Sequence, residues 1–107
     1  MKAEVEIEAG ICGFHTSARV QSRDHQHVDL ALETDCEKIQ KLSLLLEKEG
    51  ALDAYREIDP KGESVILRHG RDTCCPGCAV PIGLFKAVQV AAGLALPRDV
   101  SIKIGKE

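Results

Sequence analysis

The sequence predicts an α+β fold in which a four-stranded, largely antiparallel sheet packs in two layers against two helices. Three features predict it: alternating segments early in the chain, two stretches with helical spacing of apolar residues, and an alternating segment at the end. The expected order is three strands, a helix, a short strand, a helix and a last strand. With 107 residues, 44% of them hydrophobic, the chain is expected to form a single domain, residues 1–107.

The first three strands are predicted from a two-residue periodicity. Residues 2–9 alternate between charged and apolar side chains, and residues 28–33 alternate in a similar way. Residues 16–22 form a weaker strand between them, and a Gly-containing break at 10–13 and a polar turn at 23–26 separate the three. Short turns between successive strands predict an antiparallel meander.

The first helix is predicted directly after the meander. Thr34 and Glu37 have the spacing of a capping box, in which each side chain caps the backbone amide of the other residue. Gly50 is a natural helix end. The buried face of this helix is formed by Ile39, Leu42, Leu45 and Leu46.

The second half of the chain is less regular. Residues 51–63 suggest a short helical turn and a loop, and residues 64–68 a short strand that returns the chain to its starting end. A second helix is expected at about 79–95, and Pro97 ends it. Alternation of apolar and polar side chains over residues 100–104 predicts the last strand.

Composition limits the classes of partner. The net charge of −3 and the 3% aromatic content argue against nucleic acid, which needs a basic surface and often stacking rings. No apolar run is long enough for a signal peptide or a membrane span, so a cytoplasmic location is expected. In that compartment thiols stay reduced, and cysteine clusters indicate metal or redox chemistry more often than disulfides.

Cysteines are the most informative residues of the chain. Each predicted strand or helix carries the chain from one end of the fold to the other, and counting these crossings places all five cysteines at the same end. Two helix N-termini are expected there, and their partial positive charge favours thiolates. We therefore expect a zinc ion or an iron–sulfur cluster held by Cys36, Cys75 and Cys78, with Cys12 as the fourth ligand and Cys74 as the spare thiol.

Other interpretations of the same cysteines stay open. Free cysteines commonly serve as small core side chains, and Cys75-Pro-Gly-Cys78 before a helix is also typical of a dithiol redox site. A cysteine-dependent enzyme is a related alternative, and an interaction module without metal is a third. The adjacent thiol of Cys74 would complicate simple dithiol exchange, so metal binding is favoured.

The four histidines divide between the two ends of the predicted fold. His15 and His69 are expected near the cysteines, where either could add a ligand or an acid–base group. His25 and His27 are expected at the opposite hairpin as solvated turn residues.

Several segments resemble a family of uncharacterised proteins of about this length, found mainly in anaerobic bacteria and archaea. The resemblance covers nearly the whole chain and is carried by AGICGF at 9–14, TDCEKI at 34–39, AAGLALP at 91–97 and DVSI at 99–102. It implies relatives but supplies no function. An anaerobic setting would favour oxygen-sensitive iron–sulfur chemistry.

A local stretch is also similar to the NifU-type iron–sulfur scaffold domain. The likeness rests on Cys75 and Cys78, the helix after them and the expected strand at 99–104. It implies that Cys75 and Cys78 are cluster ligands and that a homodimer is the working form. This chain departs from that domain by its N-terminal meander and its three additional cysteines.

Overall fold

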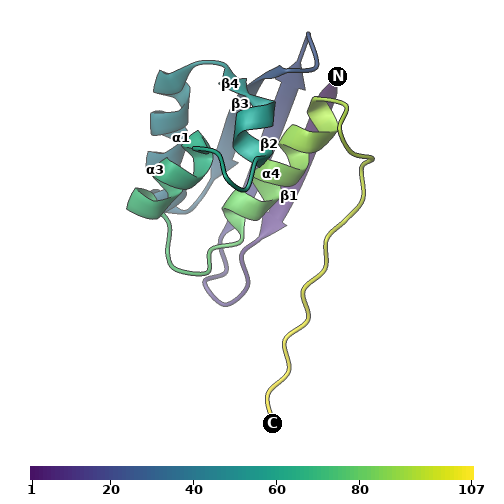
Figure 1. The fold of residues 1–107 in the computed structure, drawn as a ribbon. Coiled ribbons are helices and arrows are strands. Elements are labelled where there is room, and N and C mark those ends of the chain that lie inside the picture. The colour runs from purple at the N-terminus through teal and green to yellow at the C-terminus, as the bar shows by residue number, and fades with distance from the viewer.

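A meander of three antiparallel strands opens the chain in the computed structural model, which describes residues 1–107 (Figure 1). The strands pair in chain order, and a two-residue fourth strand adds to the free side of β3. Their bounds are β1 Lys2–Glu8, β2 His15–Ser22, β3 His27–Thr34 and β4 Leu52–Asp53. The predicted four-stranded antiparallel sheet of an α+β fold is confirmed, although its fourth strand comes from a different segment.

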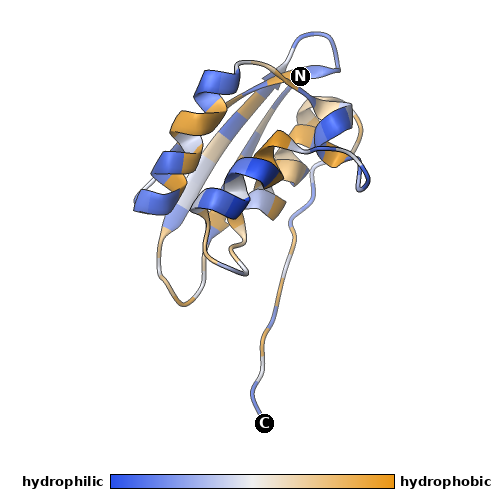
Figure 2. Ribbon diagram, turned by 60° about the vertical axis from the view of Figure 1, so that its left-hand side comes forward, coloured by the Kyte–Doolittle hydropathy of each residue, from blue (hydrophilic) through white to orange (hydrophobic).

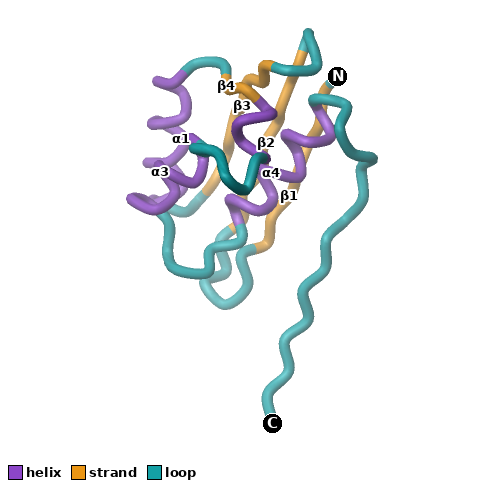
Figure 3. Tube along the Cα trace, in the orientation of Figure 1, coloured by secondary structure: helices purple, strands orange, loops and turns teal.

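Four helices cover one face of this sheet and leave the other face open (Figures 1 and 3). Helix α1 packs on β3, α4 packs on β1 and β2, and α3 packs against α1. No helix combines the length and the apolar character needed to cross a bilayer. The bounds are α1 Glu37–Glu49, α2 Ala54–Ile58, α3 Val65–Thr73 and α4 Val80–Ala91.

The hydrophobic core lies between the helices and the sheet. Alternate strand residues such as Ala3, Ile7 and Val20 point into it, whereas the charged side chains of β1 face solvent. Figure 2 shows the corresponding hydrophobic and hydrophilic bands along the helices and strands. Gly83 lets α4 approach β1 closely, because a Cβ at this position would overlap the side chain of Ile7.

Helix α3 replaces the strand predicted at 64–68. The Ser64 hydroxyl accepts a hydrogen bond from the Leu67 amide at 3.1 Å, and the buried Glu57 carboxylate accepts from the amides of Val65 and Ile66, each at 2.8 Å. These side chains satisfy the N–H groups that a helix start leaves unpaired, so the segment begins a helix. The chain still makes the predicted single pass back toward its cysteines.

The predicted capping box is wrong in detail. Cys36, not Thr34, is the N-cap residue of α1, and no side chain caps this helix. The Thr34 hydroxyl instead accepts a hydrogen bond from the Cys36 amide at 3.2 Å and pairs with the Thr16 hydroxyl at 2.8 Å. The cysteine therefore occupies the turn between β3 and α1.

The last predicted strand is also wrong. Helix α4 ends at Ala91, and residues 95–107 form no helix or strand. Figures 1 and 3 show this segment leaving the body of the molecule as an extended chain. Its alternating pattern lacks a neighbouring strand with which to pair, and a strand exists only through such pairing. Val100, Ile102 and Ile104 are consequently exposed.

Candidate functional site

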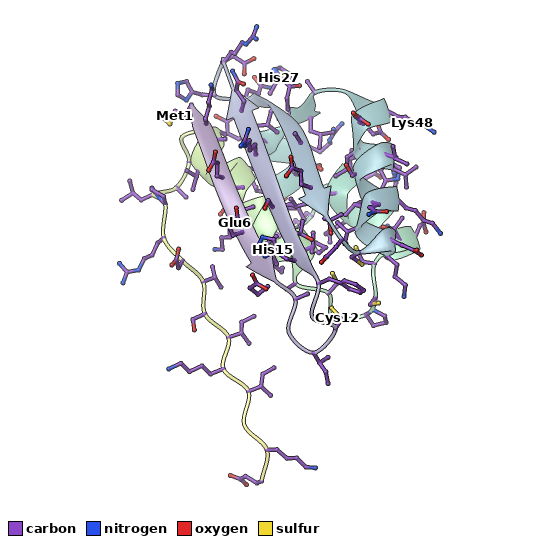
Figure 4. The ribbon with its side chains drawn as sticks, turned by 180° about the vertical axis from the view of Figure 1, so that it is seen from behind. Met1, Glu6, Cys12, His15, His27 and Lys48 are labelled. Atoms are coloured by element: carbon purple, nitrogen blue, oxygen red, sulfur yellow. The ribbon has the colours of Figure 1, made fainter.

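Three loops meet at the end of the molecule where β1 and β3 finish. They are the β1–β2 hairpin at 9–14, the turn between β3 and α1, and the α3–α4 loop at 74–79 (Figure 1). Each loop carries cysteine, and Figure 4 shows Cys12 at the tip of this end. All five cysteines are free thiols, and none forms a disulfide. The predicted convergence of the loops at one end is thus observed.

The α3–α4 loop is a compact turn that holds three of these thiols. Its first residue, Cys74, ends α3 with a hydrogen bond from its amide to the Gly70 carbonyl at 2.8 Å. The Cys78 amide then donates to the Cys75 carbonyl at 3.1 Å, and Gly77 takes the positive φ of 76° that this turn requires. Backbone geometry therefore presents three sulfur atoms within five residues.

Electrostatic effects link Cys74 to thiols on both sides of it. Partial burial raises the pKa of the Cys74 thiol above its ordinary value, while a hydrogen bond with Thr73 opposes that effect. The charge of Cys78, a hydrogen bond with it and the charge of Cys36 raise the pKa further. Cys36, Cys74 and Cys78 all pack, partly buried, against the hydrophobic core.

Lys38 adds a positive charge to this group of sulfurs. Its ammonium group donates a hydrogen bond to Cys75 Sγ at 3.0 Å, and Cys75 is exposed. That bond is the main cause of a raised Lys38 pKa, with smaller contributions from the charges of Cys75 and Cys36. We call Cys36, Lys38, Cys74, Cys75 and Cys78 the cysteine pole.

The outcome for the predicted ligands is mixed. Cys36, Cys75 and Cys78 lie at the same end of the fold, as does Cys74, which we had expected to be the spare, but these thiols do not form a metal-binding group. Cys12 lies at the same end but is exposed, and its sulfur makes one long contact of 4.0 Å with the Ala9 carbonyl. Lys38 was missed, although its place two residues after Cys36 in the first helical turn is visible in the sequence.

Helix ends contribute opposite effects at the cysteine pole. The N-termini of α1 and α4 both lie here, as predicted, and their partial positive charge favours thiolates. The C-terminus of α3 also lies here and contributes partial negative charge. The positive charge of Lys38 lies beside this C-terminus and opposes its partial negative charge. The strand predicted at 64–68 would have had no such charge at its end.

The thiols are not arranged as a finished metal site. No group of three or more His, Cys, Asp or Glu side chains has the geometry to hold a metal ion. Two shallow grooves of about 270 and 320 Å³ lie elsewhere, one among α2, α3 and α4 and one on the open face of the sheet. The chemistry of the cysteine pole therefore depends on exposed or partly buried sulfur and not on an enclosed pocket.

The histidines lie apart from the thiols. His15 bridges Glu6 and Glu8 on the open face of the sheet, and hydrogen bonds to Glu8 and Glu6 raise its pKa. His69 pairs with Glu49 of α1 at 2.8 Å. His27 pairs with Asp24 in the opposite hairpin, as expected for a turn residue. None of these hydrogen bonds reaches a cysteine.

Comparison with known families identifies the relatives of the chain. Residues 3–104 match the family described as "Family of unknown function (DUF6951)". The chain belongs to this family. The match supports the expected resemblance to an uncharacterised family, and it extends through both the cysteine pole and the extended C-terminal segment.

No curated protein matches the chain. No solved structure matches it either. The function of this DUF6951 member must therefore be argued from its own residues.

Proposed function

We propose that the cysteine pole binds a thiophilic metal centre, an iron–sulfur cluster or a zinc ion, through Cys36, Cys74, Cys75 and Cys78. The observation that supports it most is the hydrogen bond from Lys38 to Cys75 Sγ at 3.0 Å, because it joins the first turn of α1, beside Cys36, to the α3–α4 loop that carries the other three thiols. Cysteine ligands from separate segments are typical of structural zinc and cluster sites. The ammonium of Lys38 would partly balance the charge of four thiolates.

Binding requires a modest rearrangement of the thiols. Zinc–sulfur bonds are about 2.3 Å long, so four sulfurs must surround one ion tightly. Cys75 is exposed, and Cys36 and Cys78 are half-buried against the core, so their side chains would have to rotate toward one ion. Deprotonating Cys74 is the main obstacle, because its pKa is raised. A bound cation would overcome this obstacle, since metal binding releases the thiol proton.

Cys74 is proposed as the fourth ligand in preference to Cys12. Cys74 is half-buried in the loop that carries Cys75 and Cys78, and it packs against the core as Cys36 does, whereas Cys12 is exposed and its sulfur contacts the backbone of its own hairpin. The sequence alone led us to expect Cys12, because the predicted strand order places it at the same end as the other cysteines. Single substitutions distinguish the two thiols.

The test is elemental analysis of the full chain purified without oxygen. Iron, sulfide and zinc are measured in the wild type, in Cys12→Ser and in a variant with serine at all four proposed ligand positions. We expect bound metal in the wild type and in Cys12→Ser, and none in the fourfold variant. Absorbance in the visible range would distinguish a cluster from zinc.

Two results would count against this proposal. A wild-type chain without metal, before and after reconstitution with iron and sulfide or with zinc, overturns metal binding. Loss of metal in Cys12→Ser, with retention in Cys74→Ser, overturns the proposed ligand set and restores the set predicted from the sequence.

Two expectations from the sequence bear on the choice of metal. A cytoplasmic, anaerobic setting would keep the thiols reduced and favour a cluster. The likeness to the NifU-type scaffold is weaker support, because the strand at 99–104 that it requires is not part of the sheet. Cys75 and Cys78, the ligands of that likeness, remain within the proposed set.

Thiol exchange at Cys75 is the second candidate, and the Lys38 contact favours it. An ammonium 3.0 Å from an exposed sulfur stabilises the nucleophilic thiolate. Cys75 would attack a disulfide, forming a mixed disulfide while the other sulfur leaves as a thiolate. Cys78 would then displace the partner, so that two thiols give two electrons and become one disulfide.

Mass spectrometry after exposure to oxidised glutathione tests this exchange. We expect a Cys75–Cys78 disulfide that dithiothreitol reverses, with the same bond formed in Cys12→Ser. Formation of glutathione adducts at Cys12 alone would contradict thiol exchange at the cysteine pole.

A further inference from the structure

Strand β1 has an unpaired edge. It is the first strand of the sheet and pairs with β2 only, so the backbone groups that point away from β2 lack a strand partner. Such an edge readily accepts another strand. Its seven residues are long enough for a stable ladder.

The C-terminal segment has the pattern of a strand without a partner. The last backbone hydrogen bond along the chain runs from the Leu94 amide to the Gln89 carbonyl. Residues 95–107 make no backbone hydrogen bond. Val100, Ile102 and Ile104 are 55%, 73% and 92% exposed. Exposed apolar residues at alternate positions are expected to be covered by a partner.

We propose that residues 99–104 add to the β1 edge of a second copy of this chain. Each copy would donate one segment and receive one, which gives a closed, symmetric dimer by exchange of identical elements. This inference is independent of metal binding, because it uses neither the cysteines nor Lys38.

The two strands match on both faces of the extended sheet. On the helix side, Val100, Ile102 and Ile104 would continue the apolar row formed by alternate residues of β1. Gly83 of α4 packs on β1, and Val90 lies two helical turns further along the same helix. Val90 is only partly buried, so the apolar side of the sheet edge is not fully covered. Burying the three exposed side chains would supply the main driving force.

Charge also favours this pairing on the open face of the sheet. The side chains of β1 there are Lys2, Glu4, Glu6 and Glu8, all exposed, and the three carboxylates pair on their other side with Arg19 and His15 of β2. Residues of the segment that would share this face are Ser101 and Lys103, with Asp99 at the start. Lys103 would thus meet an acidic row, and opposite charges across neighbouring strands stabilise their pairing.

The direction of the segment favours a second copy over its own chain. Figure 1 shows β1 and the segment running the same way, and the segment continues past the end of the sheet. Pairing with its own β1 in this direction would be parallel, whereas every pair in the sheet is antiparallel. A second copy can approach in the orientation that gives antiparallel pairing, which is slightly more stable.

The test combines molar mass with hydrogen exchange on the full chain. Light scattering after size exclusion compares the wild type with Ile102→Asp and with Leu96→Asp, a control that places the same charge on the same segment outside the proposed strand. We expect a dimer for the wild type and Leu96→Asp, and a monomer for Ile102→Asp. Alternate amides of residues 99–104, those that would point toward β1, should be protected in the dimer only.

Each other outcome overturns the inference. A monomeric wild type with protected amides at 99–104 would show pairing with its own edge, and one with unprotected amides would show no pairing. A dimer that persists in Ile102→Asp would use another surface. Circular dichroism checks that the exposed substitutions leave the body folded.

Charge reversal at Lys103 provides a graded measurement. In Lys103→Glu a like charge would face the acidic row at two equivalent contacts of the dimer. We expect the dissociation constant to rise roughly 2- to 30-fold, from the range known for cross-strand charge pairs. An unchanged constant would contradict the proposed facing of Lys103 and Glu4, Glu6 or Glu8.

Discussion

The two ends of helix α3 use polar side chains in opposite ways. At its N-terminus, the buried Glu57 and the Ser64 hydroxyl accept hydrogen bonds from three backbone amides, at 2.8 to 3.1 Å. At its C-terminus, Cys74, Cys75 and Cys78 are free thiols, with a long 3.8 Å contact between Thr73 and Cys74 and a lysine on Cys75.

This difference separates residues needed for folding from residues available for chemistry. Each carboxylate oxygen of Glu57 accepts a hydrogen bond from a backbone amide, so this buried side chain serves the start of the helix. Thiols are weak hydrogen-bond groups, and grouping them costs the fold little while keeping several potential ligands together. Substitutions at the two ends should therefore affect different measurements.

The largest effect is expected from Glu57→Ala. Two charged hydrogen bonds at a buried helix start would be lost, and two amides would be left without partners. We expect the free energy of unfolding to fall by about 2–4 kcal/mol. Urea denaturation measures this change, and Cys75→Ser is the control at the other end of α3.

Glu57→Gln sharpens the same comparison. Glutamine has one acceptor oxygen and can replace one of the two bonds, so a loss smaller than that of Glu57→Ala is expected. An unfolding free energy for Glu57→Ala within about 0.5 kcal/mol of the wild type would show that the carboxylate does not hold the helix start.

A smaller effect is expected from the titration of Cys74. Because the folded-state pKa of this thiol is raised above its ordinary value near 9, the folded chain holds the proton more tightly than the unfolded chain. Its contribution to stability is fully present below pH 9 and is lost as the pH rises through the folded-state pKa. Cys74→Ala removes this contribution.

Melting temperatures measured in reducing, metal-free buffer between pH 7 and pH 11 check that sign. The wild type should lose more stability than Cys74→Ala as the pH rises above 9, with the two curves parallel at lower pH. Parallel curves over the whole range would mean that burial of Cys74 has no such energetic consequence.

The early part of the fold could be predicted because its signals are local. Alternation along β1 and the apolar spacing of α1 depend only on nearby residues, and both elements appear close to the predicted bounds. Helix α3 depends on Glu57, which caps it from eight residues away, so a local pattern at 64–68 suggested a strand instead. At 100–104 the alternating pattern predicted a strand, but the chain's own sheet provides no strand that pairs with it.

The candidate site was predictable in position but not in detail. Counting passes places Cys36 and the Cys75–Cys78 pair at one end whether residues 64–73 form a strand or a helix, since either element makes a single pass. The involvement of Cys74 depends on the orientation of the last turn of α3. The contact between Lys38 and Cys75 joins two segments that are far apart in the chain, so no local sequence pattern predicts it.

The smallest effect is expected from Lys38→Met, which tests the finest detail of the cysteine pole. Methionine keeps most of the side-chain length and helix propensity but removes the ammonium that donates to Cys75 Sγ. Alkylation of Cys75 by iodoacetamide, followed by peptide mass spectrometry at neutral pH, should slow by about two- to fivefold, the range of an exposed ion pair. Lys41→Met, on the same helix, is the control and should react like the wild type. Equal rates in all three proteins would show that the Lys38 ammonium does not activate Cys75, and would remove the support that this contact gives to thiol exchange.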